Sequence, residues 1–420
     1  MKILFVVKSK TIETLGPMYL AAVAKAAGHE AKIWDINNAE TAAELWKPDV
    51  LAYSVMTGDQ ERMKDVNCSI RRNMPSGQKQ PKSIFGGPHV TFFPEDFLIG
   101  RFVDATFYGE SESEFALWLA GRSGDTPIFP DINSLPWPDR TDFPNHKIRD
   151  FITSRGCPYN CSYCYNDRWN QLFAGNPVRT RDVDDVIKEI MSVKPEFAYF
   201  QDSCFGVKMD WLREFSHQYR RHVKVPFHCH LRPVQVTEDR VLLLYDANCA
   251  SVRIALETAS PKLLKLLNRE KTDLNQVADA VRLLKKWHIK LMIQNMIGLP
   301  TGTIRDDLQT LEFNIRCRPD YGWVSIFQPY PGTKLGDWCK KEGWYTGNYS
   351  EISDSFFDGS VLEFNDVYKE QLQCLQKIWA LAVECQVMPK EEELTMENFP
   401  KLVHRITRAL GDRRMYPGVM

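Results

Sequence analysis

The sequence lacks the features that mark several classes of protein. No apolar run approaches the roughly 20 residues that a helix needs to span a bilayer, and no small-residue cleavage site follows the short apolar stretch near the amino terminus. The formal net charge is only −1 at pH 7, so nothing suggests nucleic acid as a partner. We therefore expect two or three soluble domains, with no membrane span and no nucleic-acid partner.

The chain also lacks the pattern of a secreted disulfide protein. It has 11 cysteines, an odd number, and three of them stand close together in the sequence. This usage indicates a reducing compartment, so we predict a cytoplasmic protein. The other eight are scattered, and most of them are expected to be small core residues: Cys68, Cys204, Cys229, Cys249, Cys317, Cys339, Cys374 and Cys385.

The three clustered cysteines are Cys157, Cys161 and Cys164, spaced C-x3-C-x2-C after an apolar stretch that begins at Phe151. A cubane iron–sulfur cluster takes up to four thiolates, and no fourth cysteine follows closely here. One iron would stay open for a ligand that is not protein, which is a catalytic position. Two other interpretations are a structural zinc site, which usually needs two paired ligand elements, and a chance grouping of unreactive thiols.

Before these cysteines, short apolar stretches alternate with amphipathic ones, as in βαβ units. This alternation predicts a doubly wound parallel sheet of the Rossmann or flavodoxin-like kind, whose ligand binds outside the carboxyl ends of the strands. The expected strands are Lys2–Val7, Glu30–Asp35, Asp49–Ser54, Ser83–Phe85 and Asp104–Tyr108, with helices near Met18–Ala27, Thr41–Trp46, Asp59–Arg72 and Glu112–Leu119.

Three loops at those strand ends combine glycine with hydroxyl side chains: Ser54–Gly58, Gly86–Thr91 and Tyr108–Ser111. Glycine lets the backbone approach a bulky ligand, and Ser or Thr hydroxyls can bind its polar rim. The same residues also make ordinary turns. Composition alone leaves both interpretations open.

After the cysteines the alternation resumes with longer helices. If the stretch just before the cysteines is counted as the first, the expected strands are Phe151–Ser154, Phe197–Gln201, Val225–His230, Ser251–Leu256, Lys290–Ile297 and Gly322–Gln328. Six βα units are too few for the closed eight-unit barrel. The sequence therefore predicts a partial (βα)6 barrel.

The composition between and after these domains predicts the remaining parts of the chain. Residues Gly121–His146 are rich in Pro, Asp, Ser and Gly, which indicates a linker. We predict a doubly wound domain at 1–122, a linker at 123–148, a partial barrel at 149–335 and a mostly helical substrate-capping region at 336–420. Its basic tail, which is also typical of a solvated helix face, carries Lys401, His404, Arg405, Arg408, Arg413 and Arg414.

The cysteine stretch resembles the signature of the radical S-adenosylmethionine (SAM) enzymes, including the aromatic Tyr163 just before the third cysteine. The resemblance implies a [4Fe-4S] cluster on the three cysteines, with SAM on its open iron. Reductive cleavage of SAM would give a 5′-deoxyadenosyl radical, which the protein positions and shields from water and oxygen. The electron would come from an external donor of the ferredoxin or flavodoxin type.

Polar residues near the strand ends of the barrel are the candidates for binding SAM, because βα folds concentrate chemistry there. The resemblance assigns this role to Tyr163, Asp202, Ser203, Arg232, Glu257, Gln294 and Gln328. Each of the strand-end residues is alternatively a helix cap. His228 and His230 share one face of a strand, where they either contact substrate or are satisfied core histidines.

The loops of the amino-terminal third resemble the cobalamin-binding domain found ahead of many radical SAM cores. The resemblance assigns cobalamin contacts to Leu15, Gly16, Ser54, Met56, Thr57, Gly86, Gly87, Pro88, His89, Thr91, Gly109 and Glu110. The Asp-x-His-x-x-Gly loop, whose histidine binds cobalt in the mutases and methionine synthase, does not occur. We therefore predict base-off cobalamin without a protein histidine on cobalt, and Met56 as a candidate for its lower face.

Together the two resemblances, over about residues 1–335, imply a cobalamin-dependent radical SAM methyltransferase. One SAM would supply the methyl group through methylcobalamin. A second would supply the radical that activates an sp3 carbon of the acceptor, with acceptor carbon, cobalt and SAM held in line. We predict that the acceptor is a peptide or protein side chain, as for the glutamine of methyl-coenzyme M reductase.

Other functions stay open at this point. A cobalamin-dependent radical SAM cyclase or rearrangement enzyme acting on a small molecule would share both domains. A non-enzymatic module that binds the cluster and cobalamin would use them without cleaving SAM. A methylthiotransferase would need a second cluster on three amino-terminal cysteines, and that region contains only Cys68.

Overall fold

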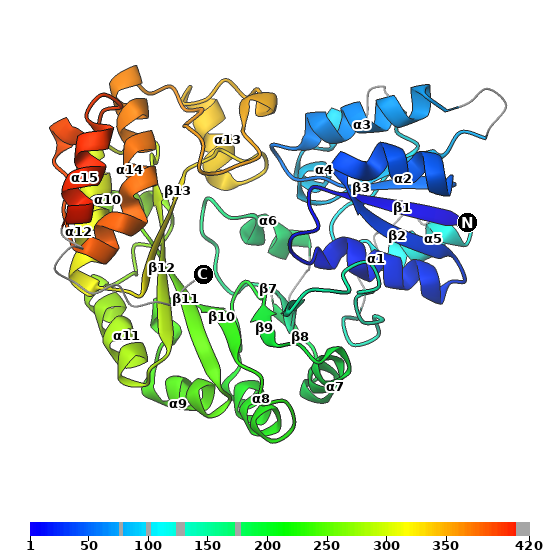
Figure 1. Ribbon diagram of the computed structural model, residues 1–420, viewed down its shortest axis with the longest axis horizontal. Coiled ribbons are helices and arrows are strands. Elements are labelled where there is room, and N and C mark those ends of the chain that lie inside the picture. Colours follow the sequence, from blue (N-terminus) through cyan, green and yellow to red (C-terminus); the bar gives the residue numbers. More distant parts are fainter. Residues whose placement is uncertain (75–78, 98–101, 123–130, 173–177, 409–420) are drawn as a thin grey trace.

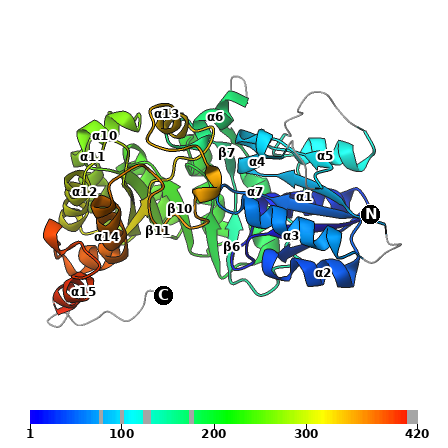
Figure 2. The same cartoon turned by 90° about the horizontal axis from the view of Figure 1, so that it is seen from above.

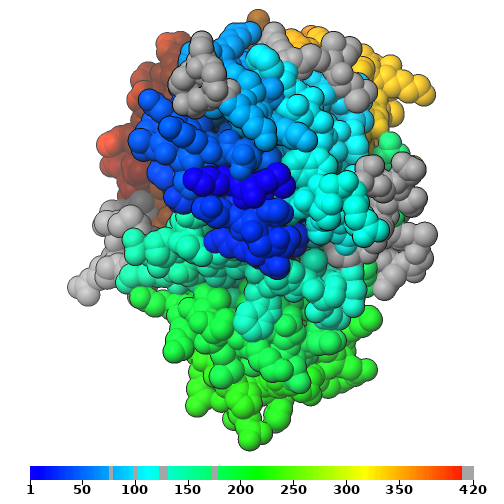
Figure 3. Space-filling model, turned by 90° about the vertical axis from the view of Figure 1, so that its right-hand side faces the viewer, coloured from blue at the N-terminus to red at the C-terminus, as the bar shows by residue number. Residues whose placement is uncertain are grey.

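The computed structural model describes residues 1–74, 79–97, 102–122, 131–172 and 178–408. Two α/β units lie side by side, with the last helices of the chain on the far side of the second unit (Figure 1). The view from above keeps this order (Figure 2). On the side shown in Figure 3, the amino-terminal unit packs directly on the middle of the chain.

The amino-terminal unit is a doubly wound parallel sheet, as predicted. Its strand order is β2-β1-β3-β4-β5, so the winding reverses between β1 and β3. The strands are β1 (Lys2–Val7), β2 (Glu30–Asp35), β3 (Val50–Ser54), β4 (Lys82–Gly86) and β5 (Ala105–Thr106). The helices are α1 (Leu15–Ala26), α2 (Ala39–Trp46), α3 (Gln60–Arg72), α4 (Pro88–Phe92) and α5 (Glu112–Leu119).

This sheet has a hydrophobic core on each face, which explains its nearly continuous apolar strands. One core joins the sheet to α1 and α5, and the other joins it to α2 and α3. The carboxyl ends of β1, β3 and β4 therefore open at one edge, between helices that are fixed by packing on both sides. Ligands of doubly wound sheets bind at this edge.

The second unit is a six-stranded parallel sheet in the order β13-β12-β11-β10-β9-β6, which confirms the partial barrel. Its strands are β6 (Ile148–Phe151), β9 (Phe197–Phe200), β10 (Phe227–Leu231), β11 (Cys249–Glu257), β12 (Lys290–Ile297) and β13 (Tyr321–Ile326). Its helices are α7 (Val183–Val193), α8 (Met209–His222), α9 (Glu238–Asp246), α10 (Pro261–Leu266), α11 (Leu274–Lys286) and α12 (Ile304–Cys317). Buried side chains of the strands and outer helices form one continuous core.

The start of this unit differs from the prediction. The first strand ends at Phe151, and Ser154–Gly156 forms a separate strand, β7, that pairs antiparallel with β8 (Val178–Thr180). The chain turns here because Thr153 and Ser154 both donate hydrogen bonds to the buried carboxylate of Asp202. The cysteines follow β7 and lead into α6 (Tyr165–Leu172), a helix that the sequence analysis does not predict.

The predicted linker is packed where the structure describes it; residues 123–130 lie outside the described ranges. Phe143 is buried in the amino-terminal core, and Arg140 pairs with Glu13 of that unit and with Glu189 of α7. These contacts fix the two units to each other. The exact domain boundaries stay predictions, although the one proposed at residue 335 falls inside α13 (Lys334–Lys341).

The carboxyl-terminal region is largely helical. Helix α14 (Asp366–Cys385) packs on β13 and α12, and α15 (Phe399–Arg408) packs on α14. The basic residues of the tail lie on α15, on the outside of the molecule (Figure 1), whereas Arg413 and Arg414 lie outside the described residues. Within the described ranges, no helix has the length and apolar character needed to cross a bilayer.

Candidate cofactor site between the two domains

The three predicted ligand cysteines lie together between β7 and α6. Cys157 and Cys161 are buried, and Cys164 is half-buried. Burial raises the pKa of the Cys157 and Cys164 thiols, that of Cys164 to about 11, and nearby Cys161 raises both further. Each thiol thus makes it harder for its neighbours to lose a proton, and a positively charged centre bound among them would favour the thiolate forms.

The same residues do not form a site for a single metal ion. The described residues contain no group of three or more His, Cys, Asp or Glu side chains that could hold one. In a cubane cluster each thiolate binds a different iron, so the ligands need not converge on one point. Three neighbouring cysteines that do not converge on one metal position therefore fit an iron–sulfur cluster better than the alternative structural zinc site.

Backbone contacts hold the cysteine loop in place. Ser162, between the second and third cysteines, donates from its amide to the Leu267 carbonyl at 3.1 Å and from Oγ to the Leu266 carbonyl at 2.8 Å. Its own carbonyl accepts from the Leu335 amide at 2.8 Å. The loop is thereby anchored to the segments that follow β11 and β13.

Three of the predicted SAM residues lie at or beside the cysteine loop. Arg232 follows β10 and donates from Nη1 to Cys161 Sγ at 3.1 Å, while its guanidinium stacks on Tyr159 at 4.1 Å. Tyr163 donates from its hydroxyl to Glu257 Oε1 at 2.6 Å. The structure therefore brings Tyr163, Arg232 and Glu257 to the cysteine loop.

Glu257 is held in an unusual conformation at the end of β11. Its φ is +72°, a left-handed value that costs a non-glycine residue energy, and the pairing with β12 is irregular there. Arg269 donates to the Tyr163 hydroxyl at 3.2 Å and pairs with Glu257 at 3.5 Å. The surroundings therefore fix this carboxylate next to the third cysteine.

The remaining predicted SAM residues are placed differently. The Asp202 carboxylate is fully buried and turned toward Thr153 and Ser154, which is the arrangement of a structural residue. Ser203 accepts from Asn166 Nδ2 at 3.1 Å, and this amide also reaches Cys164 Sγ at 3.5 Å. Gln294 is half-buried on β12, and Gln328 donates to the Gly359 carbonyl while its Oε1 is buried without a partner.

A cavity of about 390 Å³ lies between the amino-terminal sheet and the cysteine loop. Both units line it, since the loops after β1, β3, β4 and β5 face β7 and α6. Eight of the predicted cobalamin residues are part of its wall: Leu15, Gly16, Ser54, Gly86, Gly87, Pro88, Gly109 and Glu110. Gly87 is required there, because its φ is +101° and a Cβ atom would lie 2.7 Å from the Val55 carbonyl oxygen.

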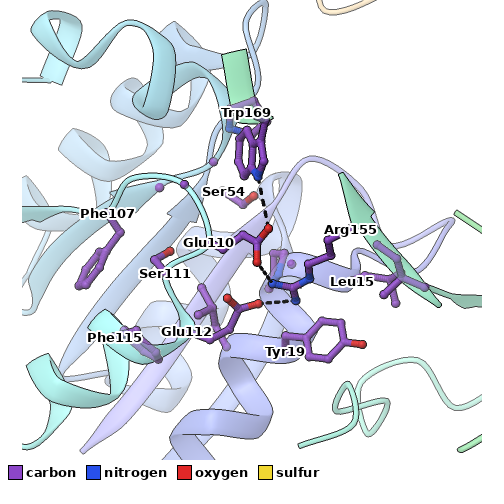
Figure 4. Close-up of a pocket in the computed structure, with 18 of the residues that line it drawn as sticks. Leu15, Tyr19, Ser54, Phe107, Glu110, Ser111, Glu112, Phe115, Arg155 and Trp169 are labelled. Carbon is purple, nitrogen blue, oxygen red and sulfur yellow. Dashed lines mark hydrogen bonds and ion pairs between the residues drawn. The ribbon is translucent and has the colours of Figure 1, made fainter. Parts of the chain in front are cut away.

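The cavity is apolar at depth. Phe5 and Ile84 of the sheet and Phe115 of α5 line it, and Figure 4 shows Phe107 and Phe115 on the side away from the charged groups. Such walls suit a large ligand with an apolar body. The glycine loops, the apolar depth and the hydroxyl of Ser54 fit the predicted corrin.

Four predicted cobalamin residues do not line the cavity. Met56 is half-exposed, and Thr91 Oγ1 bonds the backbone of Gly87 and Gly109. His89 is fully buried, and its two ring nitrogens are engaged by Thr57 Oγ1 at 2.8 Å and by Asp96 Oδ2 at 3.1 Å. Thr57, His89 and Thr91 therefore support the loops, whatever further role they have.

A charged group that is not predicted from the sequence joins the two units at this cavity. Arg155 of β7 donates to Glu110 Oε2 at 2.8 Å and to Glu112 Oε1 at 2.6 Å, and Trp169 Nε1 donates to Glu110 Oε1 at 3.3 Å (Figure 4). Burial alone would lower the pKa of Arg155, but the two carboxylates outweigh it and raise that pKa. Arg155 lies only two positions before Cys157, which is the one signal that sequence offers.

Comparisons with known proteins agree with this geometry. The radical SAM superfamily model matches residues 151–313, and the B12 binding domain model matches residues 1–118. An uncharacterized methyltransferase of Pyrococcus horikoshii is 25% identical over 372 residues, covering 77% of this chain and 78% of the relative. Cytidylyl-2-hydroxyethylphosphonate methyltransferase of Streptomyces wedmorensis is 20% identical and covers 79% and 78%.

A solved structure shares the fold. The radical SAM methyltransferase TsrM from Kitasatospora setae, with cobalamin and a [4Fe-4S] cluster bound, superposes with a TM-score of 0.67. The match covers 81% of this chain and 75% of that chain at 15% sequence identity. The likeness therefore extends over both units and their relative placement.

Proposed function

We propose that the chain, whose two parts match the B12 binding domain and the radical SAM superfamily, is a cobalamin-binding radical SAM enzyme that methylates an unactivated sp3 carbon. The observation that carries the proposal is the shared cavity. Loops of the B12-binding domain and the segment that bears the cysteines line the same space. In this arrangement cobalamin and the cluster can act on the same acceptor.

The cofactors supply the chemistry: when bound, the cluster and SAM provide a 5′-deoxyadenosyl radical, and cobalamin carries the methyl group. The protein holds and orients these groups. We assign Cys157, Cys161 and Cys164 to the cluster, Arg232 to the SAM carboxylate, and Glu257 to the polar end of SAM. Tyr163 and Arg269 keep the Glu257 carboxylate in position through their hydrogen bonds.

Base-off cobalamin without a histidine on cobalt is the second part of the proposal. The described wall of the cavity contains no histidine, and the ring of His89 is engaged by Thr57 and Asp96. The apolar depth between the sheet and α5 offers space for the displaced base. An external one-electron donor of the ferredoxin or flavodoxin type completes the scheme. Two predictions from sequence, the peptide or protein acceptor and the cytoplasmic location, gain no support from the described residues and stay predictions.

The proposal can be tested on protein purified without oxygen from cells supplied with iron and cobalamin. Paired visible and EPR spectra should show cob(II)alamin without nitrogen coupling, together with a reducible [4Fe-4S] signal that changes on adding SAM. His89→Ala should leave the cobalt signal unchanged in form. A nitrogen-coupled signal that disappears in this variant would overturn the base-off assignment.

The reaction class needs a chemical readout. With a reductant, the enzyme should convert SAM to 5′-deoxyadenosine, and Cys161→Ala should abolish this. With methyl-labelled SAM and an extract of small molecules and peptides, a product should gain one labelled methyl group. Turnover to an unmethylated, rearranged product would instead favour the cyclase alternative. A cluster that never cleaves SAM would favour the non-enzymatic module.

A further inference from the structure

The inner face of the six-stranded sheet is polar, in contrast to the apolar layers that fill a closed βα barrel. Side chains on this face alternate with the residues that pack against the outer helices. On β11, Ser251 and Arg253 are half-buried, whereas Val252 and Ile254 between them are completely buried in the core. A polar and partly accessible inner face suits a binding site better than a core.

Five side chains on this face form one cluster. Arg253 donates from Nη2 to the Tyr199 hydroxyl at 2.9 Å, and this hydroxyl lies 3.1 Å from His230 Nε2. The Tyr199 ring stacks on His228 with 4.6 Å between ring centres, and His228 Nδ1 lies 2.7 Å from Ser251 Oγ. One cation, two imidazoles and a phenol thus share a single space inside the sheet.

The positive charge of this cluster is not balanced by the described residues. None of their carboxylates lies within 4.0 Å of the Arg253 guanidinium, and Arg253 Nε and His228 Nε2 are buried without a hydrogen-bond partner. Asp150 lies beside Tyr199 on the neighbouring strand and accepts from Gln201 at 2.7 Å, and burial raises its pKa, which disfavours its charged form. A partly buried cation without a counterion is costly, so an anion from outside would be bound favourably.

The two histidines do not supply a competing charge. Burial, together with the charge of Arg253, lowers the pKa of His228 and of His230 to about 3. Both rings are therefore neutral at physiological pH, and His228 Nε2, which has no partner, can donate an N–H to a bound oxygen. The cluster combines one fixed cation with several neutral donors, which is the composition of a carboxylate or phosphate site.

Near β13, at one edge of the sheet, the same inner face carries aromatic side chains. Trp323, two strands from Arg253 and so about 10 Å across the sheet, contacts Phe356 and Phe357 with ring centres 5.6 and 5.8 Å away. Both phenylalanines are large apolar side chains that remain about 40% exposed. Exposed aromatic side chains beside a polar cluster offer a surface for the apolar part of a ligand.

We propose that the inner face of the sheet binds the methyl acceptor, which carries an anionic carboxylate or phosphate-type group on Arg253 and an apolar portion against Trp323. This inference rests on the proposed function and names the chemical class of its substrate. Arg253 lies farther from the carboxyl ends of the strands than Glu257 and Arg232 do. An acceptor anchored there extends upward to the strand ends, where the cysteines and the proposed SAM residues meet.

The test measures binding and needs no turnover. Phenylbutyrate, phenylpropylphosphonate and neutral phenylbutyramide are titrated by calorimetry into the oxidised holoenzyme. The variants are Arg253→Gln, Arg253→Lys and, as a matched control, Arg305→Gln, whose arginine is 88% exposed and far from any buried partner. Circular dichroism and retained cobalamin confirm that each variant is folded. Trp323→Ala tests the apolar contact separately.

The expected result is that at least one anion binds wild type and Arg305→Gln about tenfold or more tightly than the amide does. Arg253→Gln should abolish this preference, and Arg253→Lys should restore part of it. Trp323→Ala should weaken all three probes while keeping the preference. Whichever of the two anions binds more tightly shows whether the site prefers a carboxylate or a phosphonate group.

Three results would overturn the inference: equal affinity for acids and amide, no binding of any probe, or a preference that survives Arg253→Gln. If Arg253→Gln fails to fold, a weakened preference in the folded Arg253→Lys variant decides the question. The proposed function fails independently, because it depends on SAM cleavage and methyl transfer. A variant can lose the anion preference and still cleave SAM, and an enzyme that does not cleave SAM can still prefer the anions.

Discussion

Replacing Arg155 with methionine should loosen the connection between the two domains. The side chains of Glu110 and Glu112, which it binds, are only 5% and 7% exposed. Without Arg155, Glu110 still has Arg179 and Trp169, but the Glu112 carboxylate loses its ion pair and already has one oxygen without a partner. Removing one member of a buried ion pair costs about 3–5 kcal/mol.

A double-mutant cycle separates this charge effect from lost packing. Glu112→Gln removes the buried charge, so Arg155→Met/Glu112→Gln should be destabilised by less than the sum of the two single changes. We expect a coupling of about 2 kcal/mol. Urea unfolding followed by circular dichroism measures it, and cobalamin retained after gel filtration reports on the cavity wall.

A surface ion pair provides the control. Arg213→Met removes an arginine that is 57% exposed and paired with Asp210, and it should change the unfolding free energy by less than about 0.5 kcal/mol. The reasoning would be refuted if the losses of unfolding free energy in the two single variants were additive in the double variant. It would also be refuted if the Arg155→Met protein were as stable as the Arg213→Met protein.

Three further predictions concern the loops, the cluster and the outer helices. Gly87→Ala should abolish cobalamin retention, because its Cβ would lie 2.7 Å from the Val55 carbonyl oxygen; retention equal to that of the wild type would contradict this. Arg232→Met should lower the cluster's midpoint potential on the order of tens of millivolts in an EPR-monitored titration, because the cation beside Cys161 favours the added electron; an unchanged or raised potential would count against it. Burial raises the pKa of Asp307 from 3.8 to about 7, so the folded chain keeps a proton that the unfolded chain releases, and stability falls as pH rises from about 4 to 7. Asp307→Asn should flatten this part of the stability curve in urea unfolding at several pH values, and an undiminished slope would disprove the assignment.

Much of the fold follows from local patterns. Strand β12 is predicted to the residue, because a mostly apolar stretch lies between the preceding helix and Gly298. Thr303 caps α12 through a capping box with Asp306, three residues later. In both cases the deciding residues lie within a few positions of one another.

The features that sequence does not reveal depend on distant partners. Arg155 meets Glu112, 43 residues earlier, and nothing local identifies that partner. Asp202 ends a strand, as a ligand residue would, but its carboxylate turns inward to Thr153 because β7 leaves the sheet there. His89 follows a glycine pair, as a ligand-binding residue would, but hydrogen bonds with Asp96 and Thr57 hold its ring in the core.

The contact between Gln60 and Tyr349 has a consequence for how the protein is made. Gln60 Nε2 donates to the Tyr349 carbonyl at 2.9 Å across 289 residues of sequence, and nearby Ser353 covers Gly58 in the loop after β3. At roughly 5–20 residues per second, translation would reach Tyr349 about 15–60 seconds after Gln60. We expect a nascent amino-terminal domain to be folded but still uncovered at this loop during that interval, so cobalamin can enter before the polypeptide is complete. Cobalamin binding by ribosome-stalled chains that end before Tyr349 would show this order, and a lack of binding would mean that the vitamin is loaded only after release.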